Sequence, residues 1–212
     1  MSMKTKFLLF YIFLLIFIPI ASADKVDDYI LKGNQLVKDR RYGDAVKEYE
    51  KVLDANANNA QVHLLLGMTY AEMKNYDKAL QYTRKASELD PSYPAFYHMG
   101  LIYAAKKDIP KALESLEKAL KINPESYMAH YQKGLVHTAK KDYVQAMEHY
   151  KKAIELNPYF DEAYPALAGV YYETGDKASA LKLVDDLRAK QKKTLADGIE
   201  SWIQEKEKAG KI

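Results

Sequence analysis

Apolar residues recur along most of this chain in paired bursts, and within each burst their spacing is that of one face of an α-helix. A short polar turn separates the two bursts of a pair, as at Lys74-Asn75 and Thr174-Gly175-Asp176. A second turn follows each pair, and three of these turns carry a proline, which cannot continue the preceding helix. These prolines are Pro91, Pro124 and Pro158. The pattern predicts a series of helical hairpins, each with two helices of about a dozen residues.

Two columns of small residues give the hairpins a common period. Glycines recur every 33 or 34 residues, at Gly33, Gly67, Gly100 and Gly134. Twelve residues after each glycine comes an alanine, at Ala45, Ala79, Ala112 and Ala146, and Ala180 follows the small residue Ala168 at the same distance. A glycine inside a helix costs roughly 1 kcal/mol relative to alanine, so the glycine column predicts that two helix backbones approach closely there. A fixed period of this length indicates a solenoid in which each unit contacts its neighbours.

Tyrosine supplies much of the predicted core. The chain has 18 tyrosines, and several lie three or nine residues after the small position, at Tyr70, Tyr103, Tyr171, Tyr42, Tyr76 and Tyr143. We interpret these columns as packing between helices rather than as a binding site.

Together the columns resemble the tetratricopeptide repeat, in which leucine-glycine and tyrosine precede alanine, aromatic, alanine and proline positions. One unit shows Leu66-Gly67, Tyr70, Ala79, Ala86 and Pro91, and the next shows Phe96, Gly100, Tyr103, Ala112, Ala119 and Pro124. The resemblance implies five repeats, at residues 26–59, 60–92, 93–126, 127–160 and 161–194. The implied fold is all-α, a right-handed superhelical α-solenoid of tandem helix-turn-helix repeats.

The last repeat departs from the pattern, with Ala168 in place of glycine and Lys192 in place of proline. After it, apolar residues fall on one face of a further helix, at Leu195, Ile199, Trp202 and Ile203. We predict an amphipathic capping helix over residues 195–208, anchored by Trp202 on the last repeat. Residues 209–212 are expected to fray. A partner-binding role for the same helix face is the alternative.

The first 23 residues have the pattern of a secretory signal peptide. Lys4 and Lys6 precede an apolar run from Phe7 to Ile18, and Ala21-Ser22-Ala23 supplies the small residues that signal peptidase requires. We predict cleavage after Ala23 and export to the periplasm or the extracellular medium. The alternative is a retained N-terminal membrane anchor, because the run could span a thinned bilayer.

Composition narrows the chemistry. The chain contains no cysteine, which removes disulfides, thiol nucleophiles and cysteine-ligated zinc. Without Lys4 and Lys6, 30 of the 32 basic residues remain against 29 acidic ones, and the signs alternate along the chain. A nucleic-acid-binding protein needs a clustered basic surface, so we predict no nucleic-acid partner.

Neither catalysis nor metal binding is predicted. His130 and His137 lie seven residues apart on one helix and lack the i, i+4 spacing that chelates zinc, while His149 belongs to the following helix. His63 is assigned to packing between helices, and His98 to the groove without a partner. The glycines follow the repeat rather than forming a phosphate-binding loop. We therefore predict a chain without a cofactor, a metal ion or an enzymatic activity.

The resemblance also implies a groove lined by the first helix of each repeat. Carried over position by position, its residues are Ile30, Asn34, Leu64, Met68, Tyr97, Leu101, Tyr131, Leu135 and Tyr172. Family members that bind chaperone C-termini use a two-carboxylate clamp of lysines, an arginine and asparagines. Only Asn34 matches here, because Ile30, Pro94 and His98 replace the basic residues. The predicted groove is apolar and aromatic, a surface suited to a peptide.

The predicted function is an exported adaptor or assembly scaffold that binds a protein or peptide. One alternative is a periplasmic holdase chaperone that uses the same groove for many substrates. A second is a membrane-anchored display protein. The groove residues could also close against neighbouring helices or against a second copy of the chain.

Overall fold

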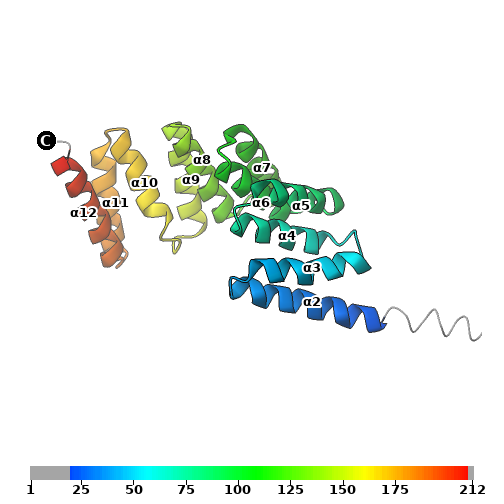
Figure 1. The fold of residues 1–212 in the computed structure, drawn as a ribbon. Helices are drawn as coiled ribbons and strands as arrows, with labels where there is room; N and C mark the ends of the chain where they lie inside the picture. The colour runs from blue at the N-terminus through cyan, green and yellow to red at the C-terminus, as the bar shows by residue number, and fades with distance from the viewer. Residues whose placement is uncertain (1–19, 210–212) are drawn as a thin grey trace, which may run out of the picture. The chain divides into compact units, whose positions relative to one another are not determined.

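The computed structural model describes residues 20–209, which form eleven α-helices and no strand within that range (Figure 1). They are α2 (Ile20–Lys38), α3 (Tyr42–Ala55), α4 (Ala60–Glu72), α5 (Tyr76–Leu89), α6 (Tyr93–Ala105), α7 (Ile109–Ile122), α8 (Tyr127–Ala139), α9 (Tyr143–Leu156), α10 (Ala163–Glu173), α11 (Lys177–Ala189) and α12 (Lys193–Ala209). The predicted all-α solenoid class is confirmed. Of the predicted signal segment, residues 1–19 lie outside the described range, as do residues 210–212 of the tail.

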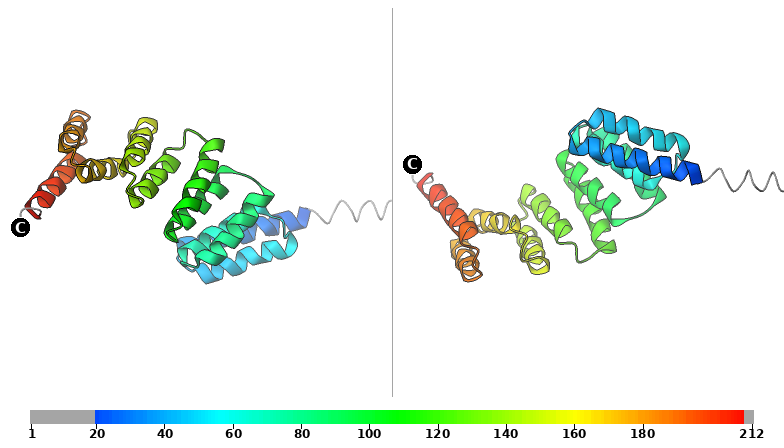
Figure 2. Two further views of the ribbon diagram at one scale, coloured as in Figure 1. Left: turned by 90° about the horizontal axis from the view of Figure 1, so that it is seen from above. Right: turned by 90° about the horizontal axis from the view of Figure 1, so that it is seen from below.

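Residues 20–91 and 92–209 belong to two compact units, which are described separately. The first unit contains the hairpins α2–α3 and α4–α5. The second contains α6–α7, α8–α9 and α10–α11, followed by α12. Figures 1 and 2 show the two helices of each hairpin side by side. No helix among those described combines the length and the hydropathy needed to cross a membrane.

A left-handed residue closes each hairpin. Arg40, Lys74, Lys107 and Lys141 have φ values of 58° to 62°, and Gly175 has a φ of 76°. In the Gly175 turn, the N–H of Asp176 donates to the Tyr171 carbonyl at 2.9 Å, which satisfies a carbonyl at the helix end. The Asp176 side chain then caps α11 by accepting the Ser179 N–H at 3.1 Å. Asp176 therefore ends α10 through its backbone N–H and starts α11 through its side chain.

The glycine column sets how closely the two helices of a hairpin pack. A Cβ built on Gly134 would overlap the ring of Tyr150, a residue that is 1 % exposed on α9. On Gly100 the same Cβ would lie 2.7 Å from Leu116 Cγ, well inside van der Waals contact. Corresponding overlaps occur between Gly33 and Tyr49 and between Gly67 and Thr83. The predicted close approach is confirmed, and the atoms that occupy it are side chains sixteen residues further on.

The predicted tyrosine core is confirmed in part. Tyr70 and Tyr103 are buried, whereas Tyr42, Tyr76, Tyr143 and Tyr171 are half-buried. The most deeply buried tyrosines are Tyr49, Tyr150 and Tyr164. Tyr49 and Tyr150 fill the space beside a glycine, so this close packing keeps nearly all water from their rings.

The C-terminal helix α12 packs on α11 and α10 through Ala196, Ile199 and Ile203, all of which are buried. Trp202, the expected anchor, also packs against this buried cluster, so the expectation is confirmed in part. Its ring is half-buried and lies edge-on to Tyr172, with 5.4 Å between ring centroids. The smaller aliphatic residues face the core, and the indole lies at the margin of the packed surface.

Polar contacts fix the position of α12. Arg188 of α11 donates to Asp197 at 3.1 Å and to Glu200 at 2.6 Å, both on α12. Lys192 occupies the expected proline position in the α11–α12 turn, where its ammonium donates to the Pro158 carbonyl at 2.9 Å and pairs with Asp161. The atypical lysine thus ties this turn to the turn between α9 and α10.

A pair of glycine-to-alanine substitutions tests the packing account. Gly134→Ala is expected to lower the free energy of unfolding by about 1–3 kcal/mol, because the buried Tyr150 ring must move. Gly198→Ala on α12 is expected to raise it by about 0.5–1 kcal/mol, because a Cβ there meets no atom within 4 Å and alanine favours the helix. Denaturant unfolding followed by circular dichroism measures both changes. Equal effects of the two variants would contradict the account.

Candidate functional site

The predicted groove residues of the first unit lie on α2 and α4. Ile30, Asn34, Leu64 and Met68 are all half-buried. The Asn34 side chain accepts a hydrogen bond from the Tyr49 hydroxyl at 2.7 Å. The one residue that matched the carboxylate clamp is therefore already engaged within its own hairpin.

The predicted groove residues of the second unit are held by aromatic neighbours. Tyr97 stacks on Tyr93 with 5.5 Å between centroids. Tyr131 lies edge-on to Phe160 at 5.0 Å, and Tyr172 contacts Trp202. Leu101 is half-buried, whereas Leu135 is 37 % exposed on α8. This unit therefore leaves apolar surface partly accessible along its first helices.

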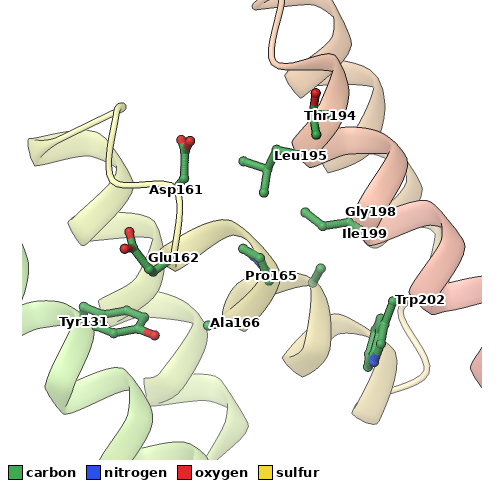
Figure 3. Close-up of a pocket in the computed structure, with 11 residues that line it drawn as sticks. Tyr131, Asp161, Glu162, Pro165, Ala166, Thr194, Leu195, Gly198, Ile199 and Trp202 are labelled. Carbon is green, nitrogen blue, oxygen red and sulfur yellow. The ribbon is translucent and has the colours of Figure 1, made fainter.

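A pocket of about 820 Å³ opens between α8, α10 and α12 of the second unit (Figure 3). Its lining residues are Tyr131, Asp161, Glu162, Pro165, Ala166, Ala168, Thr194, Leu195, Gly198, Ile199 and Trp202. We call this the α10–α12 pocket. In Figure 3, Leu195 extends from α12 toward Pro165 of α10, and Glu162 lies beside Tyr131. Most of the wall is aliphatic or aromatic, so the pocket can bind apolar groups.

Missing side-chain volume on α10 accounts for this pocket. The preceding first helix, α8, presents Tyr131, Gln132 and Leu135, and the corresponding positions of α10 carry Pro165, Ala166 and Gly169. A Cβ built on Gly198, which lines the pocket from α12, meets no atom within 4 Å, and the same holds for Gly169 of α10, which lies outside the lining. These two glycines, unlike those of the repeat column, have no packing partner in the described residues.

The charged residues that line the pocket are both acidic. Asp161 pairs with Lys192, whereas Glu162 forms no ion pair within residues 20–209 and is exposed. Glu162 precedes α10 and makes no side-chain capping bond. The nearby Glu162 carboxylate adds to the effect of burial in raising the pKa of Tyr131. The pocket thus combines an apolar wall with an open carboxylate at its rim.

The sequence indicated part of this site. Tyr131 belongs to the predicted groove, but Leu195, Ile199 and Trp202 had been assigned to a cap. Their spacing on one helix face was visible, and it is equally typical of a packing face and of a binding face. Pro165, Ala166 and Gly169 of α10 were the sequence signal for a pocket, because the corresponding positions of the other repeats carry larger residues.

The histidines form a cluster that the sequence did not indicate. His149 of α9 lies between His130 and His137 of α8, with ring centroids 5.4 Å and 5.5 Å away. His130 Nε2 lies 3.1 Å from the Pro124 carbonyl and therefore donates to it. His130 Nδ1 then accepts from His149 Nδ1–H at 3.1 Å. The interpretation of these residues as separate is corrected, because helix pairing brings positions 19 residues apart into contact.

Two further histidines lie outside this cluster. His63 is buried, with its Nε2 2.8 Å from the Ala57 carbonyl. His98 is half-buried and lies edge-on to Tyr97 at 5.4 Å, so it has an aromatic partner rather than standing alone. Among residues 20–209, no group of three or more histidine or acidic side chains is arranged to hold a metal ion.

Burial holds the cluster neutral. The pKa of His149 is lowered from 6.5 to about 4, mainly by burial and also by Lys133, His130 and His137, against an opposing effect of Glu117. Burial likewise lowers the pKa of His130 and of His137. The two neighbouring imidazoles and the Lys133 ammonium therefore disfavour the addition of a proton to His149.

Known family models and solved structures match this chain. A family model described as tetratricopeptide repeat matches residues 93–126 and 127–160, and a second model of the same description matches residues 36–99. Together the matches span more than half of the chain. A crystal structure of MamA is 28 % identical over 81 % of this chain and 95 % of its own, with a TM-score of 0.70.

Two other similarities concern the fold and a short segment of the chain. The structure of YrrB, described as a tetratricopeptide-repeat protein with an unusual peptide-binding site, is 20 % identical over 82 % of this chain and 90 % of its own, with a TM-score of 0.64. At this identity the likeness concerns the fold alone. The Hsp70-Hsp90 organising protein of Plasmodium falciparum is 40 % identical over 55 residues, which are 26 % of this chain. The match spans 10 % of that relative's length.

The histidine cluster predicts acid sensitivity. Because the pKa of folded His149 is below that of the unfolded chain, the unfolded state binds more protons as the pH falls below about 6.5. The stability present at neutral pH should therefore decline between pH 6.5 and about 4, by on the order of 2 kcal/mol from this residue after allowing for solvent screening. Denaturant unfolding at several pH values measures the decline.

A matched pair of variants assigns the effect. His149→Gln should flatten the pH dependence of unfolding, whereas His63→Gln, outside the cluster, should leave it close to that of the wild type. An unchanged slope in His149→Gln would contradict the assignment.

Proposed function

We propose, on the premise that the chain belongs to the tetratricopeptide repeat family, that it is an exported adaptor or assembly scaffold. It holds a peptide or protein partner on the first-helix face of its second unit. The relatives support a protein–protein interaction module, and the family is generally non-catalytic. The adaptor role and export go beyond that shared property.

The α10–α12 pocket carries the proposal. Helical-repeat proteins bind partners through surfaces that successive units present together. Here the pocket is apolar, it has the roughly 300–1,000 Å³ size of ligand pockets, and it lies where α10 lacks the large residues of α8. Gly198, which lines the pocket, lowers the helix propensity of α12 and has no packing partner that requires a glycine. A surface kept open in this way suits an incoming side chain.

The matched relative named for organising Hsp70 and Hsp90 does not decide the partner. Family members that bind chaperone C-termini need basic groove residues, and this chain has Ile30, Pro94 and His98 at the corresponding positions. We therefore propose a partner that is recognised through apolar side chains rather than through a C-terminal carboxylate pair.

Substitution of an exposed apolar residue tests partner binding. Leu135→Asp places a charge on the first-helix face of α8 and is expected to lower partner capture at least tenfold, as for an apolar contact of about 1.4 kcal/mol or more. Val144→Asp is the control, because Val144 is 70 % exposed and lies on the second helix of the same hairpin. Crosslinking in producing cells followed by mass spectrometry measures capture. Equal capture by both folded variants would rule out this face.

The same experiment separates the adaptor from the holdase alternative. An adaptor should yield a small set of stoichiometric crosslinked partners. Suppression of aggregation of unrelated unfolded chains, without any stoichiometric complex, would instead support the holdase.

Export is tested by the mass of the N-terminus in a producing cell. The basic start and the apolar run, followed by Ala21-Ser22-Ala23, support cleavage, so the processed chain is expected to begin at Asp24. A chain that keeps residues 1–23 and fractionates with the membrane would support the anchored alternative.

A further inference from the structure

We infer that the α10–α12 pocket binds a peptide segment of another protein in which a large apolar residue lies close to a lysine or an arginine. The inference rests on the proposed function and adds the chemistry of the ligand. Three features of the pocket support it: the apolar wall, the length of that wall and the open carboxylate at the rim.

The apolar wall runs along two turns of α12. Leu195, Gly198, Ile199 and Trp202 follow one another at i, i+3, i+4 and i+7. At 1.5 Å per residue, this stretch is about 10 Å long, which corresponds to roughly three residues of an extended peptide. The glycine in the middle of the stretch leaves the helix backbone open, since a Cβ there meets nothing within 4 Å. A bulky side chain can therefore lie against α12 between Leu195 and Trp202.

The two ends of the wall differ in polarity. Asp161, Glu162 and Thr194 lie at the N-terminal ends of α10 and α12, and Trp202 lies two turns further along (Figure 3). The aromatic end suits an apolar anchor. The acidic end suits a cation, because both charged lining residues are carboxylates. The ligand therefore has a direction, with its cation beside Glu162 and its apolar anchor toward Trp202.

Glu162 is the acidic residue available to a ligand. The Asp161 carboxylate is already paired with the Lys192 ammonium, which also contacts the Pro158 carbonyl and lies over the Tyr164 ring at 5.2 Å. Glu162 has no such partner within the described residues, and it makes no capping bond that a ligand would have to break. A ligand cation can pair with Glu162 without disturbing the fold.

Trp202 reports binding directly, because it is the one tryptophan of the chain. The test titrates the purified chain with three short tryptophan-free peptides of equal length. The first carries a leucine-phenylalanine pair flanked by lysines, the second has glutamates for the lysines, and the third has serines for the apolar pair. The expected result is a saturable change in Trp202 fluorescence with the first peptide, at least about fivefold tighter than with the second. The third should bind at least tenfold more weakly than the first.

Variants assign the binding to the pocket. Glu162→Lys should weaken binding of the lysine peptide by about fivefold and strengthen binding of the glutamate peptide. Val144→Lys places a lysine at an exposed position of α9 outside the pocket, a change of one unit of charge against two for Glu162→Lys, and should leave both affinities nearly unchanged. Gly198→Leu fills the pocket and should abolish binding of both apolar peptides.

The outcomes separate the ligand chemistry from the proposed function. If the glutamate peptide binds wild type as tightly as the lysine peptide, and Gly198→Leu still abolishes binding, the pocket is a peptide site and the inferred cation preference is wrong. The same conclusion follows if Glu162→Lys and Val144→Lys have equal effects. If no peptide binds and folded Gly198→Leu captures its cellular partners as well as the wild type does, both the inference and this location of the proposed function fail.

Discussion

The close contact between a helix glycine and a bulky side chain on the next helix is the constraint on which this fold depends. In the α8–α9 hairpin, the space that a Cβ on Gly134 would need is occupied by the Tyr150 ring. That ring is also held through a hydrogen-bond contact of 3.0 Å between its hydroxyl and that of Thr138. Equivalent contacts recur in the three preceding hairpins. Because each hairpin uses the same buried face for this contact, the other face of its first helix is free to differ from repeat to repeat.

That freedom produces the candidate site. On α10 the buried face keeps a small residue, Ala168, while the outer positions lose volume at Pro165, Ala166 and Gly169. Helix α12 then supplies a facing wall, held in place by the salt bridges of Arg188 and Lys192. The result is an apolar pocket inside a unit that is otherwise packed by repeated contacts. Ala168 and Ile199 belong both to the buried contacts and to the lining of the candidate site.

Much of the fold could be predicted from the sequence because its cause is periodic. The alanine column and the polar turns recur in all five repeats, the glycine in four and the proline in three, and the hairpins follow from them. The pocket could not be predicted in the same way, because it arises from side chains that are absent and from the position of α12. Trp202 was predicted to anchor the capping helix, and the structure shows that Ile199 and Ile203 are its more deeply buried residues, with the larger ring half-buried. The contact between His130 and His149 needed the register of two helices, which spacing along one helix does not contain.

Site-specific photo-crosslinking in producing cells tests the central claim, that the α10–α12 pocket is where a partner binds. A photoreactive phenylalanine analogue would replace Thr194, which lines the pocket and is exposed, or Val144, which is exposed on α9. The account predicts defined protein adducts from position 194 and none of the same identity from position 144. Adducts of equal yield and identity from both positions, or adducts from position 144 alone, would contradict it.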